Sequence, residues 1–531
     1  MNIYFIGMCI SMVIYIIIGA VVSRQVKNAD DFYVAGRKAP VILIAGSMIA
    51  SYTSTGMFMG DAAQCYDGAF TSIILFAGMQ SAGYIIGAVF FGRYLRRYNV
   101  YTIPEFFGKR FCSNKMKKLA AITAIITMTV YLLSVIQGIG TLMSVVTGVS
   151  YNICITLALI VFTLIAVASG SKGVLITDTL MALLFTVTTI IAVLFISNNA
   201  GGWFSAIEDL ASDPDTTLIM SWGGKPGPLY DKGIHNVMWG LIYGVVWMSV
   251  CMVGPWQSSR YLMAKDEHTI VRSSFFAALG VFLMEFLVGI GAVMVNVIHS
   301  GMEDSSQVLI WAAMNMMPKL LGVVLLTGVL SAGISSATTF LSLIGASVAN
   351  DFFETSQNKS VRISRIAMVV ASVIVLLVAI FNPPAIFWIM FLGGAIVASS
   401  WMPVAVACVL SKRLTKTGAF CGMLFGFLGC FGLRLYAALT NTDLPVYLDP
   451  SLVGIILNVI AMIIGTMFTK VSEEEKAARA ELFVIPDTEK DVVTIKKTIK
   501  YSKISVIIGV IVFAILICLW IIPYLNGVKM L

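Results

Sequence analysis

The sequence predicts an all-α polytopic membrane protein with about fourteen transmembrane helices. Hydrophobic residues make up 59% of the 531 positions and charged residues only 12%, whereas soluble domains carry about a quarter charged residues. Apolar runs long enough to cross a bilayer as helices recur along almost the whole chain. Lys and Arg are concentrated in alternate loops between these runs. A membrane-spanning helical bundle without a sizeable soluble domain follows from the three observations.

The first apolar run, 3–22, is followed by Arg24 and Lys27 and predicts an uncleaved helix with its N-terminus outside the cell. The second run, about 40–66, is long enough to span but carries hydroxyls and a glycine in its middle, Ser51-Tyr-Thr-Ser-Thr-Gly56. We expect a broken helix there. The remaining spans are expected at about 69–92, 119–147, 152–169, 174–197, 236–258, 273–299, 319–350, 363–382, 384–411, 418–439, 452–470 and 504–525.

The positions of the basic residues set the predicted topology. Thirty of the 35 Lys and Arg residues fall on one set of alternate loops, and five fall on the other set. Because cytoplasmic loops carry the excess of Lys and Arg, the first set is predicted to be cytoplasmic. The prediction is a multi-pass protein of the plasma (inner) membrane with both termini extracytoplasmic. The net charge of +8 then reflects topology, and no nucleic-acid partner is expected.

Several functional classes lack their sequence signals. The nine cysteines are scattered, without the paired spacing of a metal site. A P-loop, an HExxH motif and a GxSxG motif are all absent. We therefore expect neither an enzyme nor an ATP-driven pump, and no cofactor.

Two polar stretches inside the apolar runs are candidate binding elements. A half-unwound helix at 45–60 would free carbonyl groups for a cation and present helix ends to a solute. In the span 319–350, Ala332, Ser335, Ser336 and Thr339 share one helical face and could ligate a hard cation. Close helix packing, with hydroxyls bonded back to their own backbone, is the alternative for both stretches.

A carboxyl group inside the membrane costs free energy, so its presence there indicates a functional role by default. Asp178 lies just inside a span, so it is either a functional group or an interfacial residue reached by water. Glu285 lies deeper and has no assigned partner. Asp61 and Arg434 both fall toward the outer side and are possible partners of each other.

Four motifs make the chain resemble the sodium:solute symporter family, which includes proline, pantothenate, acetate, sialic acid and glucose symporters. These are Asp31-Phe-Tyr-Val-Ala-Gly-Arg37, the stretch Tyr101–Phe111 (YTIPEFFGKRF), Arg260-Tyr-Leu-Met-Ala-Lys-Asp266, and Ser335-Ser336 sixteen residues before Asp351. The resemblance spans about 30–420. It implies a LeuT-type core of two inverted five-helix repeats with extra helices around it.

The resemblance also implies a division of the chain. An extra N-terminal helix and the first cytoplasmic loop would occupy 1–39. The first repeat would occupy 40–197 and the second repeat 236–411, with an extracellular loop, 198–235, between them. The segment 412–531 would hold the C-terminal helices, with a cytoplasmic loop at 471–503.

Sodium sites are implied by the same resemblance. The shared site would take the carbonyls of Ala50, Thr53 and Ala332 and the hydroxyls of Ser335 and Ser336. Some family members have a second site, whose positions are occupied here by Asp178, Thr338 and Thr339.

The solute is expected near the break of the first core helix, at Tyr52, Ser54, Thr55 and Gly56, with Gln80, Gln137 and Trp247. Cys65-Tyr-Asp-Gly68 resembles the acetate permease branch and favours a small carboxylate imported with sodium by alternating access. Amino acid, pantothenate or sugar symport and proton coupling at Asp178 are the alternatives. A channel is disfavoured by the broken-helix pattern. Sodium, the solute and the lipid bilayer are the expected partners, and the protein is expected to function as a monomer.

Overall fold

The computed structural model describes residues 3–24, 26–353, 356–382 and 384–530. Across these ranges the chain is helical and has no strands; one isolated parallel bridge joins Ala39 and Ala264. Twelve of the described helices are long and apolar enough to cross a membrane, and Ile3–Ile18 and Val41–Tyr52 are shorter apolar helices. One of the twelve, Gly56–Arg97, has 42 residues and a non-helical break at Gly68, where φ is +120°. The expected number of fourteen spans therefore stays a prediction, while the all-α class is confirmed.

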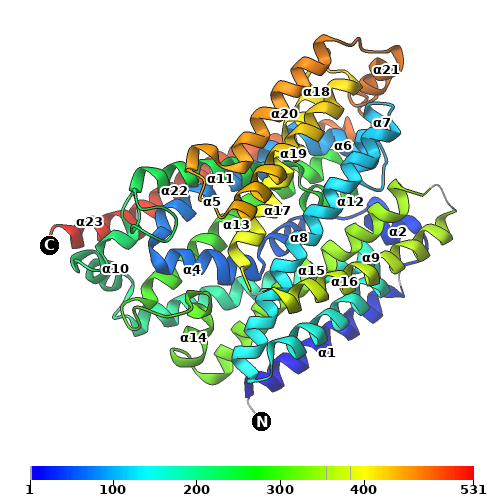
Figure 1. Cartoon of the computed structure of the whole chain (residues 1–531). Coiled ribbons are helices and arrows are strands. Elements are labelled where there is room, and N and C mark those ends of the chain that lie inside the picture. The colour runs from blue at the N-terminus through cyan, green and yellow to red at the C-terminus, as the bar shows by residue number, and fades with distance from the viewer. Residues whose placement is uncertain (1–2, 25, 354–355, 383, 531) are drawn as a thin grey trace.

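The elements that build the bundle run through the chain in the following order (Figure 1): α1 (Ile3–Ser23), α2 (Ala29–Val34), α3 (Val41–Tyr52), η2 (Gly56–Asp61), α4 (Ala62–Gln64), η3 (Cys65–Ala69), α5 (Phe70–Gly87), α6 (Arg93–Arg97), α7 (Ile103–Arg110), α8 (Asn114–Thr147), α9 (Tyr151–Asn199), α10 (Trp203–Ser212), α11 (Gly233–Val253), α12 (Pro255–Met263), α13 (Glu267–Val295), α14 (Val308–Asn315), α15 (Lys319–Asp351), α16 (Gln357–Phe381), α17 (Ile386–Ser400), α18 (Met402–Leu410), α19 (Lys416–Thr440), α20 (Pro450–Met467), α21 (Glu473–Glu481), α22 (Val492–Leu516) and α23 (Ile522–Val528).

Two of the interruptions in the described membrane helices lie against α15. At the first, the helix ends at Tyr52 and resumes at Gly56, which confirms the predicted break. At the second, the helix is interrupted at Gly254, where ψ is 136°, and resumes as α12 with Pro255 at its first position. Proline fits a helix start because its missing N–H would have no partner there. Both interruptions leave backbone polar groups inside the bundle, where only protein or a ligand can satisfy them.

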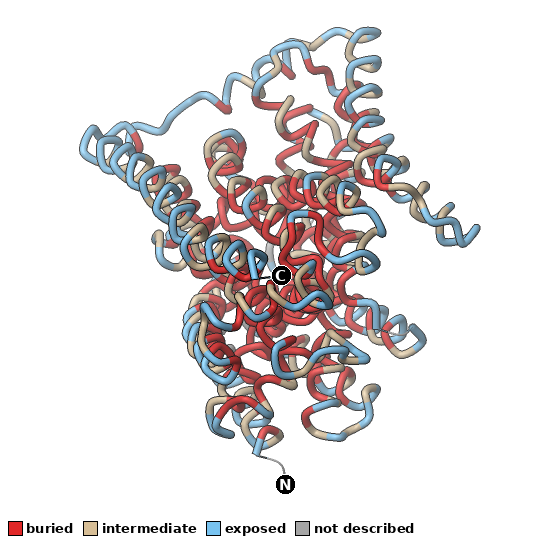
Figure 2. The backbone as a smooth tube through the Cα atoms, turned by 90° about the vertical axis from the view of Figure 1, so that its left-hand side faces the viewer, coloured by how far each residue is buried: buried red, intermediate tan, exposed pale blue. Residues whose placement is uncertain are grey.

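Helix α15 lies at the centre of the bundle and α22 at its edge. Of the apolar window in α15, 83% is buried, whereas none of that in α22 is buried. Helix α15 packs against α1, α3, α8, α9 and α16. Figure 2 shows the buried residues gathered in the middle of the molecule, with exposed residues on the outer helices and loops. Polar residues on α15 are therefore enclosed by protein and not by lipid.

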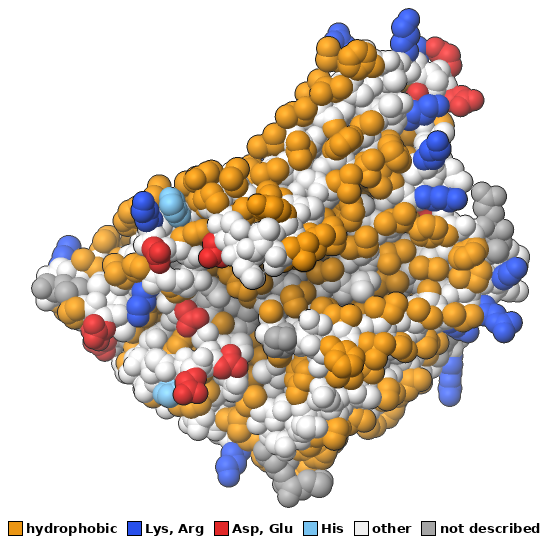
Figure 3. Space-filling model, in the orientation of Figure 1, with side chains coloured by type: hydrophobic (Ala, Val, Ile, Leu, Met, Phe, Trp, Pro, Cys, Tyr) orange, Lys and Arg blue, Asp and Glu red, His pale blue; other side chains and the backbone are white. Residues whose placement is uncertain are grey.

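The two ends of the bundle differ in charge. Lys and Arg side chains gather at the end that carries α21 and α7, while most of the visible Asp and Glu side chains lie toward the opposite end (Figure 3). Both chain termini lie toward that opposite end. The expected surface helix within 471–503 is α21, which begins with a capping box formed by Ser472 and Glu475.

Candidate functional site

The break after α3 leaves carbonyl groups without helical donors. The last helical bond of α3 runs from the Thr53 N–H to the Ile49 carbonyl at 2.9 Å. Beyond it, the Gly56 N–H bonds to the Ser54 hydroxyl at 3.2 Å, so the backbone ladder does not continue. The carbonyls of Ala50 and Thr53 thus lie at a helix end that other groups have to satisfy.

The polar face of α15 lies against this region, because α15 and α3 are in contact. Ser335 and Ser336 are fully buried and Ala332 is 2% exposed. The Ser336 hydroxyl has no hydrogen-bond partner among the described residues. A buried hydroxyl without a partner costs free energy, so this position is suited to an additional ligand. The five residues predicted for the shared sodium site therefore come from two helices in contact.

Asp178 forms a buried ion pair with Arg260, with 2.9 Å between Oδ2 and Nη2. Ser47 and Ser335 each donate a hydrogen bond of 2.6 Å to its carboxylate. The predicted spans 236–258 and 273–299 leave Arg260 in the loop between them, but it lies in α12 and is 1% exposed. An uncompensated charge is unfavourable in the interior, and the pairing offsets much of that cost.

The predicted second sodium site is only partly gathered around this ion pair. The Thr339 hydroxyl accepts a hydrogen bond of 3.0 Å from Arg260. The Thr338 hydroxyl instead donates to the Ile334 carbonyl of its own helix at 2.9 Å. The charged and hydroxyl groups that meet at Asp178 come from four helices, α3, α9, α12 and α15.

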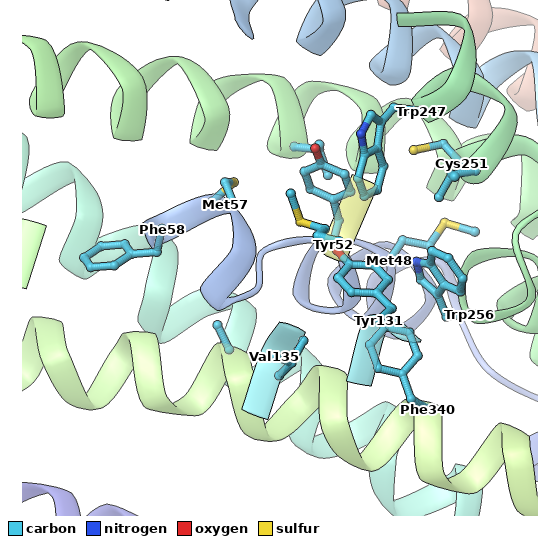
Figure 4. Close-up of a cluster of buried hydrophobic side chains, with 14 of the residues drawn as sticks. Met48, Tyr52, Met57, Phe58, Tyr131, Val135, Trp247, Cys251, Trp256 and Phe340 are labelled. Carbon is cyan, nitrogen blue, oxygen red and sulfur yellow. The ribbon is translucent and has the colours of Figure 1, made fainter. Parts of the chain in front are cut away.

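The predicted solute residues form an aromatic cluster beside the break. Tyr52 packs edge-on against Trp247, with ring centroids 5.6 Å apart, and its hydroxyl donates to Gln80 Oε1. Tyr131, which the sequence did not single out, packs against Trp247 at 6.1 Å and lies 3.5 Å from the Ser54 hydroxyl. Figure 4 shows Tyr52, Trp247 and Tyr131 grouped together, with Phe58 pointing away from them.

Other predicted solute residues bind the backbone of neighbouring helices. The Thr55 hydroxyl donates to the Val135 carbonyl at 3.2 Å, and Gln137 Oε1 accepts from the Ala385 N–H at 3.1 Å. At Gly56, a Cβ atom would lie 2.2 Å from the sulfur of Met390. This glycine lets the outer half of the broken helix lie directly against α17.

The structure also gathers residues to which the sequence gave no role. Asp61, at the end of η2, faces Glu285 of α13 and not Arg434. Both carboxyl groups are 1% exposed. The free-energy cost of a carboxyl group inside a membrane helix was the signal in the sequence that each residue has a special role. That signal does not show that two distant segments bring the two carboxyl groups together.

Comparisons with known proteins agree on family and fold. The family model described as Sodium:solute symporter family matches residues 32–426. A structure of a Na+-coupled sialic acid symporter in a substrate-bound outward-open state is similar with a TM-score of 0.74 at 16% identity, covering 89% of this chain and 99% of that one. Mhp1, a nucleobase-cation-symport-1 family transporter, in a closed conformation with bromovinylhydantoin bound, has a TM-score of 0.53 at 12% identity, covering 85% of this chain and 98% of that one. The similarity confirms the predicted LeuT-type fold.

Proposed function

The chain belongs to the sodium:solute symporter family, and we propose from this premise that it imports a small organic carboxylate together with sodium by alternating access. Family and fold make it a multi-pass transporter and not an enzyme. The observation that supports a coupling-ion site here is the buried, unpartnered hydroxyl of Ser336 beside the interrupted end of α3. Sodium would be held by the carbonyls of Ala50, Thr53 and Ala332 and the hydroxyls of Ser335 and Ser336.

Sodium at this site would join α3 to α15 and so favour the outward-open arrangement in which the solute enters. A second ion would use Asp178, Thr338 and Thr339, and it would have to compete with Arg260 for the Asp178 carboxylate. One charge crossing 100 mV supplies about 2.3 kcal/mol, and a tenfold sodium gradient supplies about 1.4 kcal/mol. For a solute without net charge, one ion could therefore sustain an accumulation of roughly 500-fold. A singly charged carboxylate cancels the charge of one sodium ion, so one ion would sustain about tenfold accumulation of such a solute.

A carboxylate solute is supported by the start of the outer half-helix at Gly56, since helix N-termini favour negative charge. The solute would lie against Tyr52, Ser54, Thr55, Gly56, Gln80, Gln137 and Trp247. We place the protein in the plasma membrane with both termini outside, as a functional monomer.

The experiment is the thermal stability of the purified protein with panels of carboxylates, amino acids, pantothenate and sugars, in sodium chloride and in potassium chloride. A ligand that binds only the folded state raises the melting temperature. We expect a solute-induced rise in sodium and little or none in potassium. An equal rise in both salts, or uptake into vesicles that follows a pH gradient and ignores sodium, would refute sodium coupling and favour proton coupling.

A further inference from the structure

Asp61 and Glu285 form a carboxyl pair that is enclosed and unsatisfied. Each residue is 1% exposed. None of their four carboxyl oxygens has a hydrogen-bond partner among the residues that the structure describes. Neither residue forms an ion pair with a described side chain, in contrast to Asp178, which has Arg260. The pair lies between η2, just beyond the helix break, and α13.

The polar groups around the pair include a hydrogen-bond donor without a described partner. Asp61, Tyr52 and Gln80 all lie next to the Glu285 carboxyl group and interact with it. Gln80 Oε1 accepts from the Tyr52 hydroxyl, and this leaves Gln80 Nε2 buried without a partner. Gln80 itself is fully buried. An amide donor of this kind, held next to two carboxyl groups, marks a built polar site and not a chance contact of acidic residues.

Two adjacent carboxyl groups in a low-dielectric interior cannot both ionise unless a cation lies between them, so they either share a proton or bind a positive group. We propose that Asp61 and Glu285 bind the ammonium group of the transported solute. This inference deepens the proposed function and rests on it: with its carboxylate near Gly56 and its ammonium group at the pair, the solute is a small zwitterion of the amino acid or betaine type.

The surroundings favour an organic cation over a metal ion. Tyr52 joins the pair to the aromatic cluster, since its ring packs on Trp247 at 5.6 Å while its hydroxyl bonds to Gln80. Aromatic faces attract ammonium groups through their quadrupoles. The free Gln80 amide nitrogen carries N–H groups and no lone pair for a metal ion, so it disfavours a metal ion here. It can instead donate a hydrogen bond to a carboxylate of the pair that also binds the ammonium group.

An acidic pocket lies next to the same segment of chain. This pocket has a volume of about 590 Å³ and is lined by Asp67, Asp209, Asp213 and Asp215, with Lys225 as its basic residue. Asp67 follows Asp61 by six residues, or about 9 Å along a helix axis. Pockets lined by one sign of charge concentrate ligands of the opposite sign. The pocket would thus raise the local concentration of a solute with a positive group on its way to the pair.

The test compares ammonium compounds with isosteres that lack the positive charge. Melting temperatures are measured in saturating sodium chloride with proline against cyclopentanecarboxylate, 4-aminobutyrate against butyrate, and glycine betaine against 3,3-dimethylbutyrate. We expect the ammonium member of at least one pair to raise the melting temperature and its isostere to leave it unchanged. Glu285→Gln and Asp61→Asn should weaken that binding at least tenfold, whereas Asp351→Asn, a buried carboxyl at the far end of α15 that is bonded to Thr102, should leave it unchanged.

Each other outcome overturns the inference. Equal shifts by an ammonium compound and its isostere, or full binding retained in Glu285→Gln, would remove the ammonium group from the pair. Loss of the sodium-induced shift in Glu285→Gln would make the bound cation sodium. If no pair differs while sodium alone still stabilises the protein, the inference fails and sodium coupling stands; if sodium has no effect, the proposed function itself fails. Where the variants do not fold, the comparison of isosteres on the wild-type protein still decides.

Discussion

Neutralising Asp178 should destabilise the protein strongly, and the cost should depend on Arg260. In Asp178→Asn the Arg260 guanidinium, 1% exposed, loses the carboxylate that lies 2.9 Å away. Removing one partner of a buried pair costs about 3–5 kcal/mol because the other charge is left uncompensated. Arg260→Met should cost a similar amount, since two hydroxyl donors are poor compensation for the remaining carboxylate. The double variant contains neither charge and should be less destabilised than either single variant.

The measurement is a double-mutant cycle by equilibrium unfolding in mixtures of SDS and detergent. The expected coupling energy is at least about 3 kcal/mol. Asp487→Asn is the matched control: its ion pair with Lys490 spans 2.7 Å but is exposed, so no measurable change is expected. If the double variant loses the sum of the two single losses, the two charges do not compensate each other and the reasoning is wrong. Sodium-dependent uptake by Asp178→Asn tests the second ion separately, because its Hill coefficient should fall toward one only if that ion exists.

Three further variants test the site, the packing and a contact of the 471–503 segment. Ser336→Ala should raise the sodium concentration for half-maximal uptake with little change in stability. Ser342 also carries a buried hydroxyl on α15 without a described partner, so Ser342→Ala is the control and should leave sodium dependence unchanged. Equal effects of the two substitutions would exclude Ser336 as a ligand. Gly83→Ala should destabilise by about 1–3 kcal/mol, because its Cβ would lie 2.4 Å from a backbone oxygen of α11, whereas Gly78→Ala in the same helix meets nothing within 4 Å; equal melting temperatures would contradict this. Burial and a neighbouring glutamate raise the pKa of Glu489 above 4.5, so its ionised form is disfavoured in the folded state. The wild-type protein therefore loses stability as the pH rises from 4.5 through the raised pKa. The melting temperature of Glu489→Gln relative to wild type should increase over this range, and a constant difference would argue against the shift.

The broken helix was predictable because its cause is local. Hydroxyl residues and glycine weaken the helical ladder wherever they cluster, and the stretch Ser51–Gly56 shows this in six letters. The observed gap between Tyr52 and Gly56 falls within that stretch. The residues of the shared sodium site were implied by the family resemblance, and they stay a proposal.

Arg260 shows where reading along the chain is insufficient. Its neighbours in sequence resemble a cytoplasmic loop motif, and its charge fits that side of the membrane. The structure turns it inward, because the break at Gly254 redirects α12 and brings the guanidinium to Asp178. Hydropathy averages a window of residues and therefore cannot register one charge that is compensated by a distant helix.

By itself, the sequence determined the membrane class, the position of most spans, the break in the first core helix and the family. These depend on the free energy of placing each segment in lipid, which is a sum over neighbouring residues. Only the tertiary structure decided which buried charges are paired, Asp178 with Arg260, and which face each other unpaired, Asp61 with Glu285. Pairing depends on contacts between helices more than eighty residues apart in the chain, and the electrostatic free energy of such contacts follows distance in space and not separation in sequence.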